Sequence, residues 1–82
     1  MASLFVVQES DFLPLAECAT SPDGVTLNRR KHFVEVKFAK ELTVNRKVTG
    51  MRHAVWYSSV AGVAGAKVVQ FDKDGLKLVA EG

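Results

Sequence analysis

The residues with the most evident chemistry in this chain are cationic, and most of them lie close together in the sequence. Residues 29–53 contain eight of the eleven Lys and Arg residues and only two acids, which gives this segment a net charge of +6. The rest of the chain has three Lys residues against seven acids. Clustered Lys and Arg attract phosphate backbones through counterion release, whatever the base sequence. The alternative interpretation is a solvated polar surface that keeps a small domain soluble.

Aromatic residues accompany these cations. Trp56 and Tyr57 are adjacent, and on a strand adjacent side chains point to opposite faces, so one ring should be exposed near Arg52. Phe33 falls on the polar side of its own predicted strand, beside Lys37. Binders of single-stranded nucleic acid combine cations that follow the backbone with rings on which bases stack, at about 1–3 kcal/mol per base. The same rings could instead fill the core or anchor a protein partner.

These observations favour a small non-enzymatic nucleic-acid-binding module of low sequence specificity. Low specificity is expected because no recognition helix for a major groove is evident. Single-stranded nucleic acid is the favoured ligand, because cations beside an exposed ring are typical of proteins that bind it. The predicted contact residues are Arg29, Arg30, Lys31, Phe33, Lys37, Arg46, Lys47, Arg52, Trp56 and Tyr57.

The alternative prediction is a protein-interaction subunit, adaptor or inhibitor that docks on an acidic partner through the same basic face. Nucleic-acid binding should weaken steeply with salt, whereas a dock with an aromatic anchor should keep a large salt-independent part. A homodimer is compatible with either prediction, because a small core and an unpaired edge strand both favour association.

Catalytic and metal sites find little support in the sequence. One Cys and two His fall short of the four ligands of a structural zinc site, and no G-x-S-x-G nucleophile motif is present. Asp72, Asp74, Gly75 and Glu81 match four positions of a calcium-binding loop, but Gln70 stands where the first Asp is needed. We therefore expect no enzyme activity, no metal and no cofactor.

Length and composition set the class of protein. The 82 residues predict a single small β domain over positions 1–82, and 48% apolar and 24% charged residues are typical of a folded chain. The apolar stretch Leu4–Val7 is far shorter than the about 20 residues of a membrane-spanning helix. The lone Cys18 excludes an internal disulfide. We expect a cytoplasmic protein without membrane contact.

The elements that must position these residues are mostly short strands. An apolar run with β-branched residues predicts a strand over 3–8. Period-two alternation predicts another over 32–38, with Val34, Val36 and Phe38 on the buried face.

The middle of the chain is harder to interpret. The next strand should bulge, end near Asn45 or open toward solvent there, because Arg46 would otherwise enter the core. Segment 51–66 fits either a helix or a strand. We favour a strand over 53–60 and a Gly-rich loop over 61–65, since a helix would contain two glycines at about 1 kcal/mol each relative to Ala.

Turns divide the remaining segments. The sequences SPDG (21–24) and DKDG (72–75) predict turns, the second within a hairpin over 67–80 whose glycine supplies a positive φ. Segment 9–18 should form one irregular or 3₁₀ turn. The sum is a mainly β fold of five or six strands, in a small barrel or curled antiparallel sheet of the OB-like or SH3-like kind, with at most one short helix.

Overall fold

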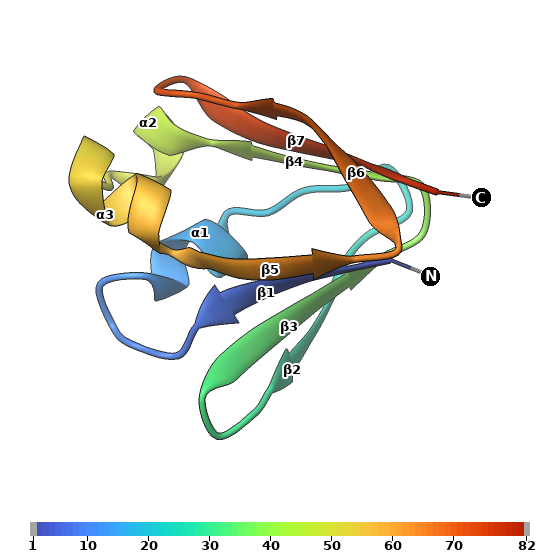
Figure 1. Cartoon of the computed structure of the whole chain (residues 1–82), viewed down its shortest axis with the longest axis horizontal. Coiled ribbons are helices and arrows are strands. Elements are labelled where there is room, and N and C mark those ends of the chain that lie inside the picture. Colours follow the sequence, from blue (N-terminus) through green and yellow to red (C-terminus); the bar gives the residue numbers. More distant parts are fainter. Residues whose placement is uncertain (1, 82) are drawn as a thin grey trace.

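A computed structural model describes residues 2–81, which form seven strands and three short helices. Strands account for 49% of the chain, so the prediction of a mainly β fold is confirmed. The strands form two antiparallel sheets instead of a closed barrel, and three short helices replace the single one expected. Figure 1 shows the two sheets facing each other, with α2 and α3 at one end.

Sheet A has the strand order β2–β3–β1–β5. Its strands are β1 (Ala2–Val7), β2 (Thr26–Arg29), β3 (Phe33–Phe38) and β5 (Val60–Ala64). The central strand β1 pairs with β3 from Ala2↔Phe38 to Val7↔Phe33, and with β5 on its other side. Because strand side chains alternate between faces, Leu4 points into the core while Phe5 points outward.

Sheet B has the order β4–β7–β6. Its strands are β4 (Glu41–Asn45), β7 (Gly75–Ala80) and β6 (Ala66–Phe71). The outer edge of β4 is covered at one point, where the backbones of Thr20 and Thr43 exchange hydrogen bonds of 2.9 and 2.8 Å. At the other edge, β6 has a register shift between Val68 and Gln70. The possible homodimer stays a prediction. At this edge, the register shift in β6 is a feature that discourages edge-to-edge pairing.

The helices are short, and of the three only α2 has a side-chain cap at its start. They are α1 (Leu13–Glu17), α2 (Arg46–Thr49) and α3 (His53–Ser58). Pro14 lies in the first turn of α1, where a backbone N–H has no partner within the helix, so proline is tolerated. The expectation of one irregular or 3₁₀ turn over 9–18 is therefore corrected, because residues 13–17 form an α-helix. The Asn45 side chain caps α2 by accepting from the Lys47 N–H at 2.9 Å, and Gly50 ends it at φ 72°. β4 therefore ends at Asn45, which is one of the three outcomes expected for this strand.

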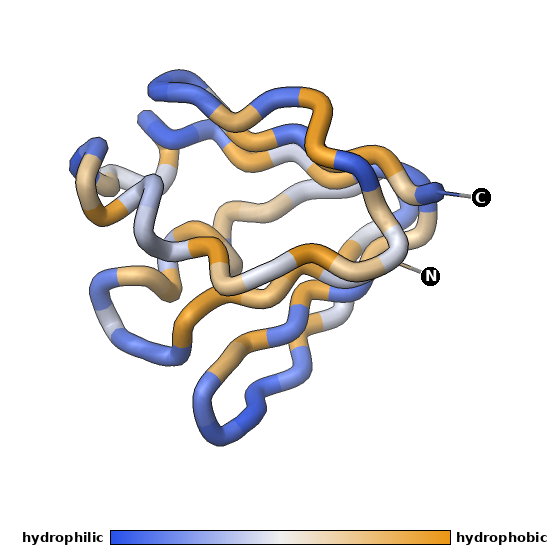
Figure 2. Tube along the Cα trace, in the orientation of Figure 1, coloured by the Kyte–Doolittle hydropathy of each residue, from blue (hydrophilic) through white to orange (hydrophobic). Residues whose placement is uncertain are grey.

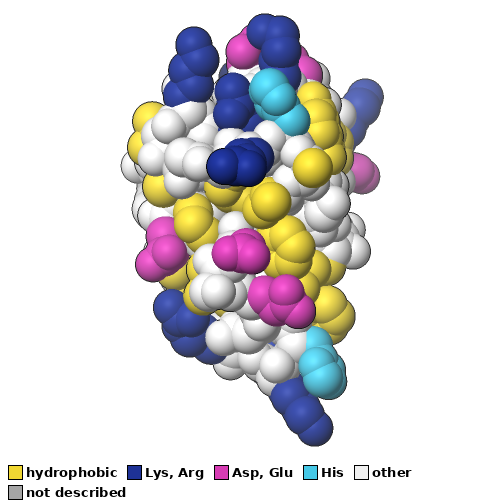
Figure 3. Space-filling model, turned by 90° about the vertical axis from the view of Figure 1, so that its left-hand side faces the viewer, with side chains coloured by type: hydrophobic (Ala, Val, Ile, Leu, Met, Phe, Trp, Pro, Cys, Tyr) yellow, Lys and Arg dark blue, Asp and Glu magenta, His cyan; other side chains and the backbone are white. Residues whose placement is uncertain are grey.

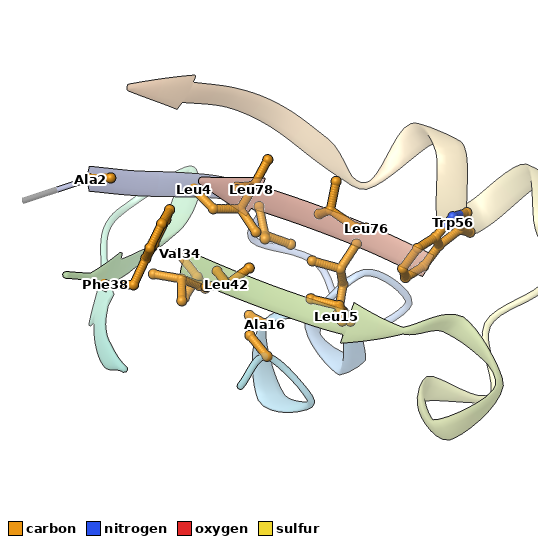
Figure 4. Packing of buried hydrophobic residues seen from close by; sticks show 14 of the residues in the cluster. Ala2, Leu4, Leu15, Ala16, Val34, Phe38, Leu42, Trp56, Leu76 and Leu78 are labelled. Atoms are coloured by element: carbon orange, nitrogen blue, oxygen red, sulfur yellow. The ribbon is translucent and has the colours of Figure 1, made fainter. Parts of the chain in front are cut away.

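One hydrophobic cluster fills the space between the sheets. Val34, Val36 and Phe38 are at most 1% exposed, which confirms the predicted buried face of β3. In Figure 4, Leu15 of α1 packs against the core residues of the strands. Trp56 of α3 lies at the end of the cluster opposite Phe38. Figure 2 shows the matching hydropathy: apolar residues recur along the strands, and the β2–β3 and β6–β7 turns are hydrophilic.

The strand predicted over 53–60 is wrong, and so is the loop predicted over 61–65. Residues 53–58 form α3, and residues 60–64 form β5, which pairs with β1. The helix buries Trp56 completely and lets its indole N–H donate to the Asp72 carbonyl at 2.7 Å. These tertiary contacts outweigh the weak local preference of a six-residue segment. No helix among residues 2–81 is long and apolar enough to cross a membrane.

The β6–β7 hairpin over the DKDG turn is confirmed. The Asp72 carboxylate accepts from the backbone N–H groups of Asp74 at 2.9 Å and Gly75 at 3.1 Å. Gly75 does not have the positive φ that we expected. The absence of a side chain is needed here for another reason: an ideal Cβ would lie 2.9 Å from the Val44 carbonyl oxygen on the neighbouring strand.

Gly75→Ala should therefore lower the free energy of unfolding by about 1–2 kcal/mol, because the backbone of β4 must move to admit the methyl group. Urea denaturation followed by far-UV circular dichroism measures this change. Gly62→Ala is the matched control, since Gly62 is also a strand residue and nothing lies within 4 Å of its ideal Cβ. Equal stabilities of the two variants would contradict the explanation.

Candidate protein interface

The outer face of sheet A carries a shallow apolar hollow of about 280 Å³, lined by Phe5, Phe33, Ala61 and Gly62. Phe5 and Phe33 come from neighbouring strands, and their rings meet edge to face with centroids 6.4 Å apart and an interplanar angle of 74°. Phe33 is 43% exposed. Gly62 lies directly opposite Phe5 on β5 and has no side chain to cover the ring.

The size and shape of the hollow indicate what it can hold. Small-molecule sites are usually clefts of about 300–1,000 Å³ that enclose most of the ligand and contain a few convergent polar groups. This hollow is smaller and open, and its four lining residues are aromatic, Ala or Gly. It is suited to one large apolar side chain that projects from another protein, which is how interface anchors are seated.

A polar network lies beside the hollow on the same face. The Ser3 hydroxyl donates to the Glu35 carboxylate at 2.7 Å, and the Arg30 guanidinium donates to it at 3.1 Å. Glu35 is only 8% exposed although it points outward. The Ser3 hydrogen bond, followed by that of Arg30, lowers the pKa of Glu35 below its ordinary value, with a smaller contribution from the charge of Lys37. The acid of this face is thus already paired.

This network should make stability depend on pH through Glu35. Because its pKa is lower in the folded than in the unfolded state, the ionised carboxylate stabilises the fold at pH values above its ordinary pKa of 4.5. That stabilisation is lost as the pH falls through the lower folded value. Glu35→Gln should lower the urea midpoint at pH 7 and reduce the fall in midpoint between pH 5 and pH 3. Identical midpoint-versus-pH curves for wild type and variant would refute the assignment.

The predicted basic residues divide between two parts of the molecule. The hairpin cations, Arg29, Arg30, Lys31 and Lys37, lie on β2, β3 and their turn, whereas the helix cations, Arg46, Lys47 and Arg52, lie on α2 and just before α3. Figure 3 shows one end of the molecule, where Lys and Arg gather towards the top and bottom and Asp and Glu lie between them. At this end of the molecule, acidic side chains therefore separate the basic ones. The role of each cation as a nucleic-acid contact stays a prediction.

Arg46 is engaged within the protein. Its guanidinium donates to the backbone carbonyls of Lys73 and of Met51, the latter at 2.9 Å, and its backbone N–H donates to the Asp74 carbonyl at 3.1 Å. The side chain thus connects the start of α2 to the β6–β7 turn. This arrangement gives Arg46 a structural role that the sequence did not indicate.

Of the two adjacent rings, only that of Tyr57 is exposed, at 47%, whereas Trp56 is fully buried. The expectation that one ring would be exposed is confirmed, but the reason is the turn of a helix, not the alternation of a strand. Tyr57 packs on Phe71 with ring centroids 5.3 Å apart. Trp56 presents no ring face on which a base could stack.

Comparison with known proteins gives one informative result. No protein-family model and no curated protein sequence matches this chain. Its fold is similar to that of a chain in the structure of the phenol hydroxylase–regulatory protein complex, with a TM-score of 0.74, 18% sequence identity and 95% of each chain covered. At this identity the likeness establishes a common fold.

Sequence reasoning identified Phe33 but missed Phe5, Ala61 and Gly62. The signal for Phe5 was present, because it alternates with the inward-pointing Leu4 and Val6 along the first strand. Ala61 and Gly62 were missed because their strand was interpreted as a loop.

Within residues 2–81, no group of three or more His, Cys, Asp or Glu side chains could hold a metal ion.

Proposed function

We propose that this chain is a small noncatalytic subunit that docks on a larger protein through the outer face of sheet A and regulates or assembles it. The observation that carries the proposal is the open hollow between Phe5, Phe33 and Gly62. A partly exposed aromatic pair on a sheet face is the kind of anchor site around which protein interfaces form.

Two further observations support this function. All three helices pack at the ends or inner sides of the strands, which leaves the outer face of sheet A accessible in Figure 1. The similar solved chain also comes from a complex of proteins, that of phenol hydroxylase with a regulatory protein. The competing nucleic-acid function has less support, because Arg46 is occupied by backbone carbonyls and Trp56 is buried.

Affinity purification from extracts of the organism that encodes the chain tests the proposal. The tagged wild type should retain a larger protein in near-stoichiometric amount at physiological salt, and Phe33→Ser should lose it. Tyr57→Ser is the matched control, because Tyr57 is exposed to a similar extent but lies on α3. Failure of the wild type to retain any protein, with tight binding to oligo-dT at the same salt, would overturn the proposal in favour of nucleic acid.

A further inference from the structure

We infer that the hollow and three of the hairpin cations, Arg30, Lys31 and Lys37, form one recognition surface for an acidic protein segment, in which a large apolar side chain is flanked by carboxylates. This inference rests on the proposed function and specifies the chemistry of the partner. The apolar side chain would enter between Phe5 and Phe33, and the carboxylates would meet the cations of the β2–β3 hairpin.

The apolar half of the surface is built into the sheet. Phe5 and Phe33 project outward from paired strands, and the register sets Gly62 opposite Phe5. Nothing lies within 4 Å of an ideal Cβ at Gly62, so the space above this residue is free. Because Phe5 and Phe33 already touch edge to face, an incoming side chain would complete an aromatic cluster without moving them.

The charge of the surrounding surface selects the partner. Residues 30–37 contain three Lys and Arg residues against a single acid, Glu35. Arg29 lies opposite the inward-pointing Val34 and therefore belongs to the other face of the sheet. The carboxylate of Glu35 is held by Ser3 and Arg30, so it is not available to repel other acids. Lys37 points outward on the same face, since it lies opposite Ser3 on β1 and Thr26 on β2. The uncompensated charge beside the hollow is positive, which complements acidic groups.

The arrangement of the cations favours a protein segment over a nucleic-acid strand. At the end of the molecule that Figure 3 shows, a nucleic-acid strand that contacted the Lys and Arg side chains at both top and bottom would cross the Asp and Glu side chains between them. An acidic segment centred on the hollow needs the hairpin group alone. The surface therefore fits a compact acidic ligand better than an extended polyanion.

Selection from a phage-displayed library of random 12-residue peptides tests the inference without assuming a partner. Peptides enriched on the immobilised wild type should contain Trp, Phe or Leu flanked by Asp and Glu. Gly62→Leu should weaken their binding by about tenfold or more, because the new side chain fills the hollow while strand geometry permits it. Phe33→Ser provides a second variant, and circular dichroism verifies that both fold.

Charge reversal tests the cationic half. Lys37→Glu should weaken the binding of the selected peptides by about tenfold. The control is Lys77→Glu, because Lys77 is comparably half-buried but lies on the outer face of sheet B, and it should change binding by less than about twofold. Three results would overturn the inference. The enriched peptides could be basic or uncharged, they could bind Gly62→Leu as well as wild type, or oligo-dT bound at the helix cations could displace them. The proposed docking function would survive these results if the natural partner were still retained by wild type and lost with Phe33→Ser, whereas no enrichment at all would count against both.

Discussion

Trp56→Ala should lower the free energy of unfolding by about 3–5 kcal/mol and leave a large part of the chain unfolded at 25 °C. Trp56 is the largest fully buried side chain, and it packs against Phe71 with ring centroids 5.8 Å apart. Truncation would open a cavity between the sheets and leave the Asp72 carbonyl without its indole donor. A domain of this size has a free energy of unfolding of only about 5 kcal/mol, so the expected loss is comparable to its total stability.

The measurement is urea denaturation followed by circular dichroism, because the variant removes the only tryptophan fluorophore. Trp56→Phe is the control, since it keeps an aromatic ring in the core but removes the N–H donor. Its expected cost is about 1–2 kcal/mol. A Trp56→Ala protein with the urea midpoint of the wild type would show that the burial of Trp56 does not stabilise the fold.

The strands that could be predicted are those with strong alternation and clear turns. β3 has three apolar residues at period two, all of which are buried, and the hairpin of β6 and β7 is defined by DKDG. The predicted arrangement, a small barrel or curled antiparallel sheet, fits only in part, for a reason that the strand pattern does not contain. Residues 39–40 carry the chain from β3 in one sheet to β4 in the other, so the two consecutive strands do not pair. Local alternation reports which face of a strand is buried but not which neighbour it pairs with.

Segment 51–66 could not be predicted because its structure depends on distant residues. A six-residue helix is too short to show a helical period, and its helical state is fixed by the burial of Trp56 and the bond to Asp72. β5 contains Gly62, which disfavours a strand locally, yet it pairs with β1. At this position a larger side chain would fill the hollow, which Gly62 leaves open.

The candidate interface was predictable in part. The outward position of Phe33 and the basic character of the hairpin follow from the sequence. The contact between Phe5 and Phe33 does not, because it requires knowing that β1 and β3 are neighbours. The pairing of Glu35 with Ser3, across 32 residues, likewise depends on that register. Non-local pairing is therefore what converts separate sequence features into a surface.

The structural role of Arg46 likewise could not be predicted from the sequence, because its hydrogen-bond partners include distant residues. It leads to the second prediction of large effect. Arg46→Ala should lower the free energy of unfolding by about 2–3 kcal/mol, because the guanidinium holds the backbone carbonyls of Lys73 and Met51. Without it, the β6–β7 turn and the residues that link α2 to α3 lose their shared donor. Urea denaturation measures the change, and amide hydrogen exchange should show faster opening near residues 51 and 73.

Lys47→Ala is the matched control, since Lys47 is the next cation in α2 and its ammonium group makes no hydrogen bond or ion pair to residues 2–81. Its substitution should change stability by less than about 0.5 kcal/mol. If Arg46→Ala and Lys47→Ala were equally stable and both weakened binding to oligo-dT, Arg46 would be a phosphate contact as the sequence suggested. A loss of stability confined to Arg46→Ala, with unchanged peptide binding at the hollow, would instead establish that this cation supports the fold and is separate from the docking surface.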